Sequence, residues 1–297
     1  ILTASLLTGV LTACGSSKAQ TDAAETTTEE ATAEETAAAE ETADTDAQAE
    51  TGDLQVITVA ATAVPHAEIL EAAKPILAEQ GYDLQVTVFD DYVQPNEVVE
   101  AGDIDCNYFQ HIPYLNSYNE ERGTHLVSVG EIHYEPIGIY AGTESDLSNI
   151  SDGADIAIPN DTTNEARALL ILQDNGIITL KEDAGIDATI NDIAENPHNI
   201  NFVEMEAAQV SKVLSEVAFA VINGNYALDA GLNAQTDALV SETSDSLAAQ
   251  TYVNVVVVKE GNEDNEGVKA LVNVLKSDDI KKFIEETYEG AVVPFEG

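Results

Sequence analysis

Arg167 is chemically distinctive, because the chain has a formal net charge of −44 and only two arginines, Arg122 and Arg167. Residues 156–159 form an apolar run typical of a buried strand. Thr162 and Glu165 then have the spacing of a helix capping box, so Arg167 lies near the start of a predicted helix. A cation is unfavourable there, since a helix N-terminus already carries a partial positive charge. Two hypotheses stay open: an anion docks on the guanidinium and free backbone N–H groups, or Arg167 forms a salt bridge with one of the many nearby acids.

Motifs for hydrolytic catalysis are missing from the sequence. It contains no Gly-x-Ser-x-Gly, no His-Glu-x-x-His and no cysteine and histidine at a spacing that supports catalysis. Its five histidines are scattered along the chain. We therefore predict that the protein is not an enzyme, needs no cofactor and has no metal site. A metal would need three or four converging ligands, and His66, His111 and His133 with nearby acids are the alternative set that stays open.

The first residues are typical of a lipoprotein signal peptide. Residues 1–13 are apolar and end in Leu-Thr-Ala before Cys14, the pattern of a lipobox whose cysteine becomes lipidated. The run is too short to span a bilayer and lacks a charged n-region, so we interpret residues 1–13 as a partial signal peptide. Acyl chains on Cys14 would anchor the protein to the cell membrane, on its extracytoplasmic side. Cys106 would then be left without a disulfide partner.

The next segment is predicted to be a linker. Residues 15–52 are mainly Ala, Thr, Glu and Asp and contain no Val, Ile, Leu or aromatic residue. Such a segment cannot bury enough apolar surface to offset the entropy of ordering, and its like charges extend it. We expect residues 14–53 to form a lipidated, acidic, disordered linker.

The charge balance also restricts the partners. Eleven basic residues in the whole chain cannot form a basic patch, which excludes nucleic acid. A small zwitterion is compatible, because its carboxylate needs one local cation and its ammonium suits an acidic surround.

The apolar spacing predicts an α/β fold. Residues 54–60, 66–80 and 84–89 have the patterns of a strand, a helix and a strand, which implies a parallel sheet with a right-handed crossover. Binding residues in such sheets gather beyond the carboxyl ends of the strands. A second unit begins near Gly142, and two lobes would be joined by strands near residues 140 and 252. Further elements are expected at residues 207–214 (helix), 219–222 (strand), 253–258 (strand) and 267–288 (two helical stretches, returning to the first lobe).

Several long motifs follow one another in a consistent order. They are Asp91-Tyr-Val-Gln-Pro-Asn96, Gly102-Asp-Ile-Asp-Cys-Asn-Tyr-Phe-Gln-His-Ile-Pro-Tyr-Leu115, Tyr134-Glu-Pro-Ile-Gly-Ile-Tyr140, Pro159-Asn-Asp-Thr-Thr-Asn-Glu-Ala-Arg-Ala-Leu169 and Ala220-Val-Ile-Asn-Gly-Asn-Tyr-Ala227. This order closely resembles the NlpA/MetQ family of methionine-binding lipoproteins, the substrate-binding component of a methionine ABC importer. The similarity covers essentially the whole folded part.

The resemblance implies a two-lobed periplasmic-binding-protein-like fold with a ligand cleft between the lobes, preceded by the acidic tether. We expect residues 54–141 and 252–297 to form lobe 1 and residues 142–251 to form lobe 2. The implied function is capture of L-methionine or a close analogue and its delivery to the permease and ATPase of the importer. The alternatives are another amino acid, a methionine-containing dipeptide, or a metal-binding importer component.

The resemblance also implies a set of ligand-binding residues. Arg167 would bind the ligand carboxylate with Asn164 beside it, and Asn223 would accept a hydrogen bond from the ligand ammonium. The groups expected around the thioether side chain are Tyr92, Phe109, His111 and Tyr134. Phe109, His111 and Tyr134 also suit purely structural roles. For Asn225 and Tyr226 we favour packing and turn roles, and for Tyr114 a place on the surface of a lobe.

Two positions depart from the family pattern. Cys106 replaces a residue that is usually small, such as Ala, and residues 241–252 replace an acidic Ser-Pro-Tyr-Asn-like stretch. The second departure leaves the fine specificity for the ligand open.

Overall fold

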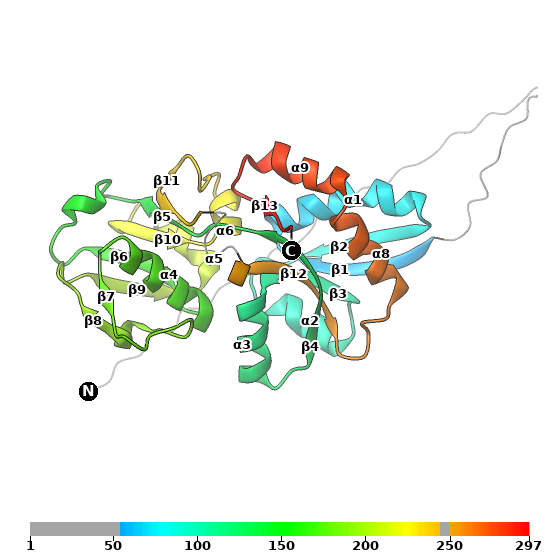
Figure 1. Cartoon of the computed structure of the whole chain (residues 1–297), viewed down its shortest axis with the longest axis horizontal. Coiled ribbons are helices and arrows are strands. Elements are labelled where there is room, and N and C mark those ends of the chain that lie inside the picture. The colour runs from blue at the N-terminus through cyan, green and yellow to red at the C-terminus, as the bar shows by residue number, and fades with distance from the viewer. Residues whose placement is uncertain (1–53, 244–249, 297) are drawn as a thin grey trace, which may run out of the picture. The chain divides into compact units, whose positions relative to one another are not determined.

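The computed structural model describes residues 54–243 and 250–296. The predicted signal peptide, Cys14 and the acidic linker lie outside the described residues. The described chain folds into two α/β lobes, each built on its own sheet (Figure 1).

Lobe 1 is built on a six-stranded sheet in the order β13-β4-β12-β3-β1-β2. Its first three strands run parallel, as the strand–helix–strand pattern predicted, while β12 is antiparallel to both β3 and β4. The strands are β1 (Gln55–Ala61), β2 (Tyr82–Val88), β3 (Cys106–His111), β4 (Leu126–Tyr134), β12 (Val253–Lys259) and β13 (Val293–Pro294).

Helices cover both faces of this sheet, so its central strands are apolar on both sides. Figure 1 shows α1 (Glu68–Glu79), α8 (Glu266–Leu275) and α9 (Asp278–Tyr288) over one face, with α2 (Gln94–Ala101) and α3 (Ile112–Arg122) over the other. Along β12, Val256 and Val258 pack with the first group, whereas Val255 and Val257 pack with the second. The period of two in strand side chains therefore explains the unbroken valine run.

Lobe 2 is built on a five-stranded sheet in the order β11-β5-β10-β6-β9. Along β10, Phe219 and Val221 face the core beneath α4, whereas Ala220 and Ile222 face α5 and α6. The elements are β5 (Gly138–Ala141), β6 (Asp155–Pro159), β9 (Asn201–Met205), β10 (Phe219–Ile222), β11 (Ala238–Ser241), α4 (Thr162–Asp174), α5 (Ala207–Val210) and α6 (Gly224–Asp229), beside a small sheet of β7 (Thr179–Leu180) and β8 (Ile193–Glu195).

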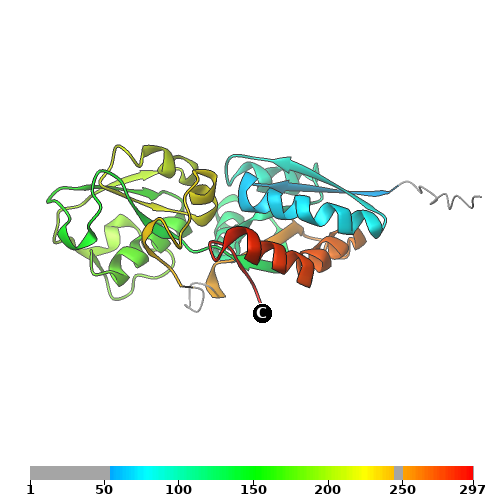
Figure 2. The same cartoon turned by 90° about the horizontal axis from the view of Figure 1, so that it is seen from above.

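The chain passes between the lobes twice, once between β4 and β5 and once between β11 and β12. Figure 2 shows the first connection at the junction of the lobes, and residues 244–249 of the second lie outside the described part of the chain. The first passage comes earlier than the expected boundary at residue 142, because β5 already pairs with β10. Ile137 and Ile139 then bury their side chains in the core of lobe 2.

The start of α4 differs from the predicted capping box. Its N-cap is Asp161, whose Oδ1 accepts a hydrogen bond from the backbone N–H of Asn164 at 3.1 Å. Thr162 is the first helical residue, and Glu165 instead accepts from the backbone N–H of Ile190 at 2.9 Å. The prediction of a Thr162/Glu165 box was therefore wrong, because aspartate is a strong N-cap residue and precedes the threonine directly.

Candidate ligand site between the two lobes

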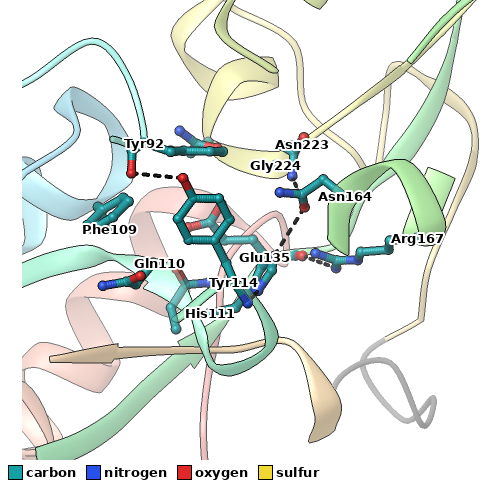
Figure 3. A pocket seen from close by; sticks show the side chains of 12 residues that line it. Tyr92, Phe109, Gln110, His111, Tyr114, Glu135, Asn164, Arg167, Asn223 and Gly224 are labelled. Carbon is teal, nitrogen blue, oxygen red and sulfur yellow. Dashed lines mark hydrogen bonds between the residues drawn. The ribbon is translucent and has the colours of Figure 1, made fainter. Parts of the chain in front are cut away.

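A cavity with about 330 Å³ of empty volume lies where the two lobes meet (Figure 3). Lobe 1, lobe 2 and the first connection all contribute to its walls. The lining residues are Tyr92, Phe109, Gln110, His111, Tyr114, Glu135, Asn164, Arg167, Asn223, Gly224, Asn225 and Asn254.

Strand ends position most of these side chains. Phe109, Gln110 and His111 occupy the carboxyl end of β3, and Asn223 directly follows β10. Asn164 lies in the first turn of α4, just beyond β6. The strands of each lobe thus present their carboxyl ends to the same cavity, as expected for α/β sheets.

Asn223 carries a buried oxygen that lacks a partner among the described residues. Its Nδ2 donates to Oδ1 of Asn164 at 2.7 Å, while its own Oδ1 accepts nothing from them. His111 fixes the orientation of the Asn164 amide. Its Nδ1 accepts from the backbone N–H of Tyr114, so its Nε2 carries the hydrogen and donates to Oδ1 of Asn164 at 3.1 Å. An unpaired buried acceptor is costly, and here it lies at the wall of a cavity, where a ligand donor would satisfy it.

Arg167 meets a protein carboxylate and also lines the cavity. Its Nε donates to Oε1 of Glu242 at 3.0 Å, its Nη2 donates to Oε2 of Glu242, and Nη2 also donates to the backbone oxygen of Glu135 at 2.8 Å. The rings of Tyr252 and Tyr134 lie over the guanidinium, with centroids 4.3 and 5.6 Å from its carbon. The salt-bridge hypothesis is thus confirmed, and the cavity-facing position leaves ligand binding by Arg167 as a prediction.

Glu242 is held as a carboxylate in this arrangement. Burial would raise the pKa of Glu242, but the charge of Arg167 and the hydrogen bonds from Arg167 and Tyr134 outweigh it, so the pKa lies below its ordinary value.

Glu135 is the centre of a buried hydrogen-bond network beside the cavity. Its Oε1 lies 2.7 Å from Nε2 of His133 and 3.3 Å from Nε2 of His66. His66 Nε2 also donates to Oδ1 of Asn254 at 3.1 Å, an atom that can only accept, so this nitrogen carries the hydrogen. Hydroxyl groups of Thr62 and Tyr108 contact the Nδ1 atoms of His66 and His133, respectively.

The network holds its histidines neutral at physiological pH. Burial lowers the pKa of His66 to about 4 and that of His133 to about 3. Burial also raises the pKa of Glu135, although His66 and Arg167 oppose that shift. Gly224 is required opposite this carboxylate, because a Cβ there would lie 2.8 Å from Cβ of Glu135.

Aromatic side chains form another wall of the cavity. The ring of Tyr92 lies 5.9 Å from Phe109 in lobe 1 and 4.9 Å from Tyr226 in lobe 2. The Tyr92 hydroxyl donates to Oδ1 of Asn225 at 2.5 Å, and Tyr114 donates to the backbone oxygen of Tyr92 at 3.0 Å. The wall therefore closes the cavity from both lobes.

The structure brings together nearly all the predicted ligand-binding residues. Arg167, Asn223, Asn164, Tyr92, Phe109 and His111 line the cavity, whereas Tyr134 lies behind Arg167 and donates to Glu242. The sequence did not indicate Gln110, Glu135, Gly224 or Asn254 as cavity residues, and the roles expected of Tyr114 and Asn225 were structural. Most of these lie inside or next to the motifs quoted above, but the motifs did not separate cavity residues from their structural neighbours.

One set of residues in the described part of the chain has the geometry to hold a metal ion. It consists of His66, His133 and Glu135, whose ligand atoms lie within 4.8 Å of one another. His111, the third histidine of the alternative metal-binding set, contacts Asn164 instead.

Two lobes, each with strands ending at a shared cavity, define a solute-binding protein with the periplasmic-binding-protein fold. The model of the NlpA lipoprotein family matches residues 57–296, and the chain belongs to this family. Among the helices of residues 54–243 and 250–296, none is long and apolar enough to cross a membrane.

Solved and curated relatives agree with this family. A lipoprotein structure from Ruminococcus gnavus is 66% identical, with a TM-score of 0.81, and the match covers 82% of this chain and 100% of that one. The methionine-binding lipoprotein MetQ of Bacillus subtilis is 41% identical over 83% of this chain and 90% of its own length. A nutrient-binding protein from Burkholderia cenocepacia, solved bound to methionine, is 41% identical with a TM-score of 0.76, covering 80% of this chain and 99% of that one.

Proposed function

We propose that this protein captures L-methionine, or a close analogue, in the interlobe cavity and passes it to an ABC importer. The observation that carries the proposal is the buried, unpaired Oδ1 of Asn223 at the wall of a cavity that Arg167 also lines. An ammonium group can donate to Oδ1 of Asn223, and a carboxylate can accept from the guanidinium of Arg167. The relatives named for methionine supply the class of amino acid.

The guanidinium of Arg167 and the oxygen acceptors of the site lie next to each other, as the carboxylate and ammonium of an amino acid do. Arg167 donates to the backbone oxygen of Glu135, whose side chain also lines the cavity. The ligand carboxylate would meet Arg167, while the ammonium would meet Oδ1 of Asn223 and the carboxyl oxygens of Glu135. Both groups of the ligand branch from one carbon atom, which suits this neighbouring arrangement.

The ligand side chain would pack against Tyr92, Phe109 and Tyr114. A thioether is polarizable, and each sulfur–aromatic contact contributes about 0.3–1.5 kcal/mol. These contacts select shape and polarizability, whereas the guanidinium and the oxygen acceptors supply much of the affinity. His111 would complete the wall as a neutral ring. Its burial, and to a lesser extent the charge of Arg167, lower its pKa to about 3.

The proposed cellular setting follows from the predicted lipid anchor. Acyl chains on Cys14 would hold the protein at the extracytoplasmic face of the cell membrane, where the permease and ATPase of the importer receive the loaded form. Binding would favour lobe closure, because a ligand between the lobes binds the closed form better than the open one. No catalytic step forms part of this proposal.

Calorimetric titration tests the ligand. L-methionine should bind more tightly than norleucine, which has a similar shape without sulfur, and much more tightly than alanine. Asn223→Ala should weaken methionine binding while the far-ultraviolet circular dichroism spectrum stays unchanged. Binding of another amino acid with no heat from methionine would overturn the ligand assignment, and native mass spectrometry of the purified protein would then identify the bound molecule by mass.

One observation favours a second candidate, a metal-binding importer component. His66, His133 and Glu135 converge, and neutral imidazoles with a carboxylate suit Zn²⁺. The hydrogen bonds among these groups already satisfy them without a metal. Zinc analysis of protein purified without chelator decides between the candidates: one zinc per chain, lost in His133→Gln, would favour the metal-binding role.

A further inference from the structure

We propose that His66, which does not itself line the cavity, sets the hydrogen-bonding direction of a residue that does. That residue is Asn254, whose amide oxygen His66 holds, so that the amide N–H group is left for the ligand. His66 is thus a positioning residue that acts through Asn254. The inference rests on the proposed function, because it gives the ligand carboxylate a second donor beside Arg167.

The backbone of Asn254 is fixed by the sheet of lobe 1. The residue is the second of β12, and it pairs with His111 of β3 on one side and with His133 of β4 on the other. Its side chain is buried and lines the cavity. The oxygen and the nitrogen of a side-chain amide are nearly equal in size, so packing alone does not decide which of them faces the ligand. The hydrogen-bond partner of the amide decides it.

His66 supplies that partner. Its Nε2 lies 3.1 Å from Oδ1 of Asn254 and 3.3 Å from Oε1 of Glu135. Oδ1 can only accept, and a carboxylate oxygen beside the same nitrogen favours the same assignment, so Nε2 carries the hydrogen. With the amide turned round, its nitrogen would need an Nε2 without hydrogen. Glu135 would then face a lone pair of the ring in place of a donor.

Thr62 holds His66 in this tautomer. The ring of His66 is buried, and its burial keeps it neutral at physiological pH. A neutral imidazole with its hydrogen on Nε2 has an acceptor at Nδ1, and the hydroxyl of Thr62 donates to it across 2.8 Å. Thr62 directly follows β1 and is itself buried. A chain of fixed hydrogen bonds therefore runs from Thr62 through His66 to Asn254.

The direction of the Asn254 amide matters because the cavity already contains acceptors. Asn223 offers an unpaired oxygen and Glu135 offers carboxyl oxygens, and both suit the ligand ammonium. With its own oxygen held by His66, Asn254 offers Nδ2, from which a carboxylate can accept. Turned round, Asn254 would offer one more oxygen, which would repel a carboxylate.

The tautomer of His66 can be measured directly. Nitrogen-15 NMR of the histidine rings distinguishes a ring nitrogen that carries a hydrogen from one that does not, and loss of the signals in His66→Gln assigns them. At neutral pH, His66 should carry its hydrogen on Nε2. A hydrogen on Nδ1 would overturn the inference and would leave the proposed function intact.

Two substitutions of His66 separate positioning from packing in calorimetric titrations with L-methionine. His66→Phe keeps a buried ring but removes the donor, so the affinity should fall by at least about tenfold. His66→Gln keeps an N–H group at about the position of Nε2, so this variant should bind within about threefold of the unmodified protein. Equal losses in the two folded variants would contradict the positioning role. Failure of the unmodified protein to bind methionine would instead count against the proposed function.

A double-mutant cycle tests the route through Asn254. In an Asn254→Ala background, His66→Phe should lower the affinity by no more than about threefold, because the amide that His66 orients is gone. His133→Phe is the matched control, since His133 is also a buried histidine, and its ring bonds to Glu135 and Tyr108. Its effect should be similar in both backgrounds.

An equal loss from His66→Phe with and without the Asn254 amide would mean that His66 acts by packing alone, and the inference would fall. If the variants of His66 do not fold, the NMR measurement on the unmodified protein still decides, with its ring signals assigned through their neighbours in space.

Discussion

The Nε atom of Arg167 donates to Oε1 of Glu242 across 3.0 Å, although 75 positions separate the two residues in the chain. Arg167 belongs to a helix of lobe 2, and Glu242 begins the second connection between the lobes. Their side chains are 4% and 11% exposed, so this ion pair is almost fully removed from water. The pair links the ligand cavity to the connection about which the lobes would move.

Arg167→Ala should lower the free energy of unfolding by about 3–5 kcal/mol, because it leaves the Glu242 carboxylate buried without its partner. Urea denaturation measures this loss. The double variant Arg167→Ala, Glu242→Gln should lose less than the single variant, since no buried charge remains unpaired.

Arg122 is the natural control for that experiment. It pairs with Glu97 at 3.4 Å, and both side chains are about half exposed. Exposed ion pairs contribute at most about 1 kcal/mol, so Arg122→Ala should change the unfolding free energy little. Equal losses in the two arginine variants would contradict the assigned importance of burial.

Asn223→Ala should weaken ligand binding by about 1–3 kcal/mol, because the ammonium loses its acceptor. The variant should cost only about 1 kcal/mol of stability, because it removes the bond from Nδ2 to Oδ1 of Asn164, an atom that still accepts from His111. Tyr140→Phe is a matched control: its hydroxyl is also buried without a described partner, but it lies in the core of lobe 2 and does not line the cavity. Its removal should leave binding unchanged and should not lower the melting temperature.

Closure of the lobes should depend on hydroxyl groups that bridge them. Tyr226 of lobe 2 donates to the backbone oxygen of Asp90 in lobe 1 at 3.1 Å. Tyr226→Phe removes this bond and keeps the ring, so the closed form should lose about 0.5–1.5 kcal/mol and the affinity should fall several-fold. Small-angle scattering with saturating ligand, together with titration, measures both effects. Tyr82→Phe, on the outer strand β2, should behave as the unmodified protein does.

The buried histidines should make stability depend on pH. Burial lowers the pKa of His66 to about 4 and of His133 to about 3, whereas both would titrate near 6.5 in the unfolded chain. The unfolded chain therefore binds more protons below pH 6.5, and stability present above that pH is lost as the pH falls towards the folded values. Each histidine contributes a slope of up to about 1.4 kcal/mol per pH unit.

Buried acids with a raised pKa have the opposite effect on stability over part of this pH range, because they stabilise the folded chain as the pH falls. Burial raises the pKa of Asp161 to about 6, so the folded chain takes up this proton first as the pH falls. The comparison of His133→Gln with the unmodified protein isolates the histidine contribution. Between pH 6.5 and 4 the variant should show the shallower loss of unfolding free energy, and above pH 7 the two curves should run parallel. Parallel curves throughout would mean that His133 is not held neutral.

Local patterns in the sequence determined much of this protein. The valine run of β12, the strand–helix–strand opening and the apolar strand at β10 predicted their elements, because a period of two or 3.6 is a property of the segment itself. The resemblance of the motifs around His111, Arg167 and Asn223 to the NlpA/MetQ family indicated most of the cavity residues. Each motif lies at or just beyond a strand end, where an α/β sheet gathers its binding residues.

Tertiary structure alone decided which side chains meet. Glu135 lies two residues from His133 in sequence, yet its role depends on His66, which comes from the start of the chain's first crossover. Glu242 was one acid among 55 until the pairing of β11 with β5 placed it against Arg167. Arg167 therefore has an internal counter-ion and also lines the cavity. The sequence could not reveal this pairing, because ion pairing depends on the distance between charges in space and not on their number along the chain.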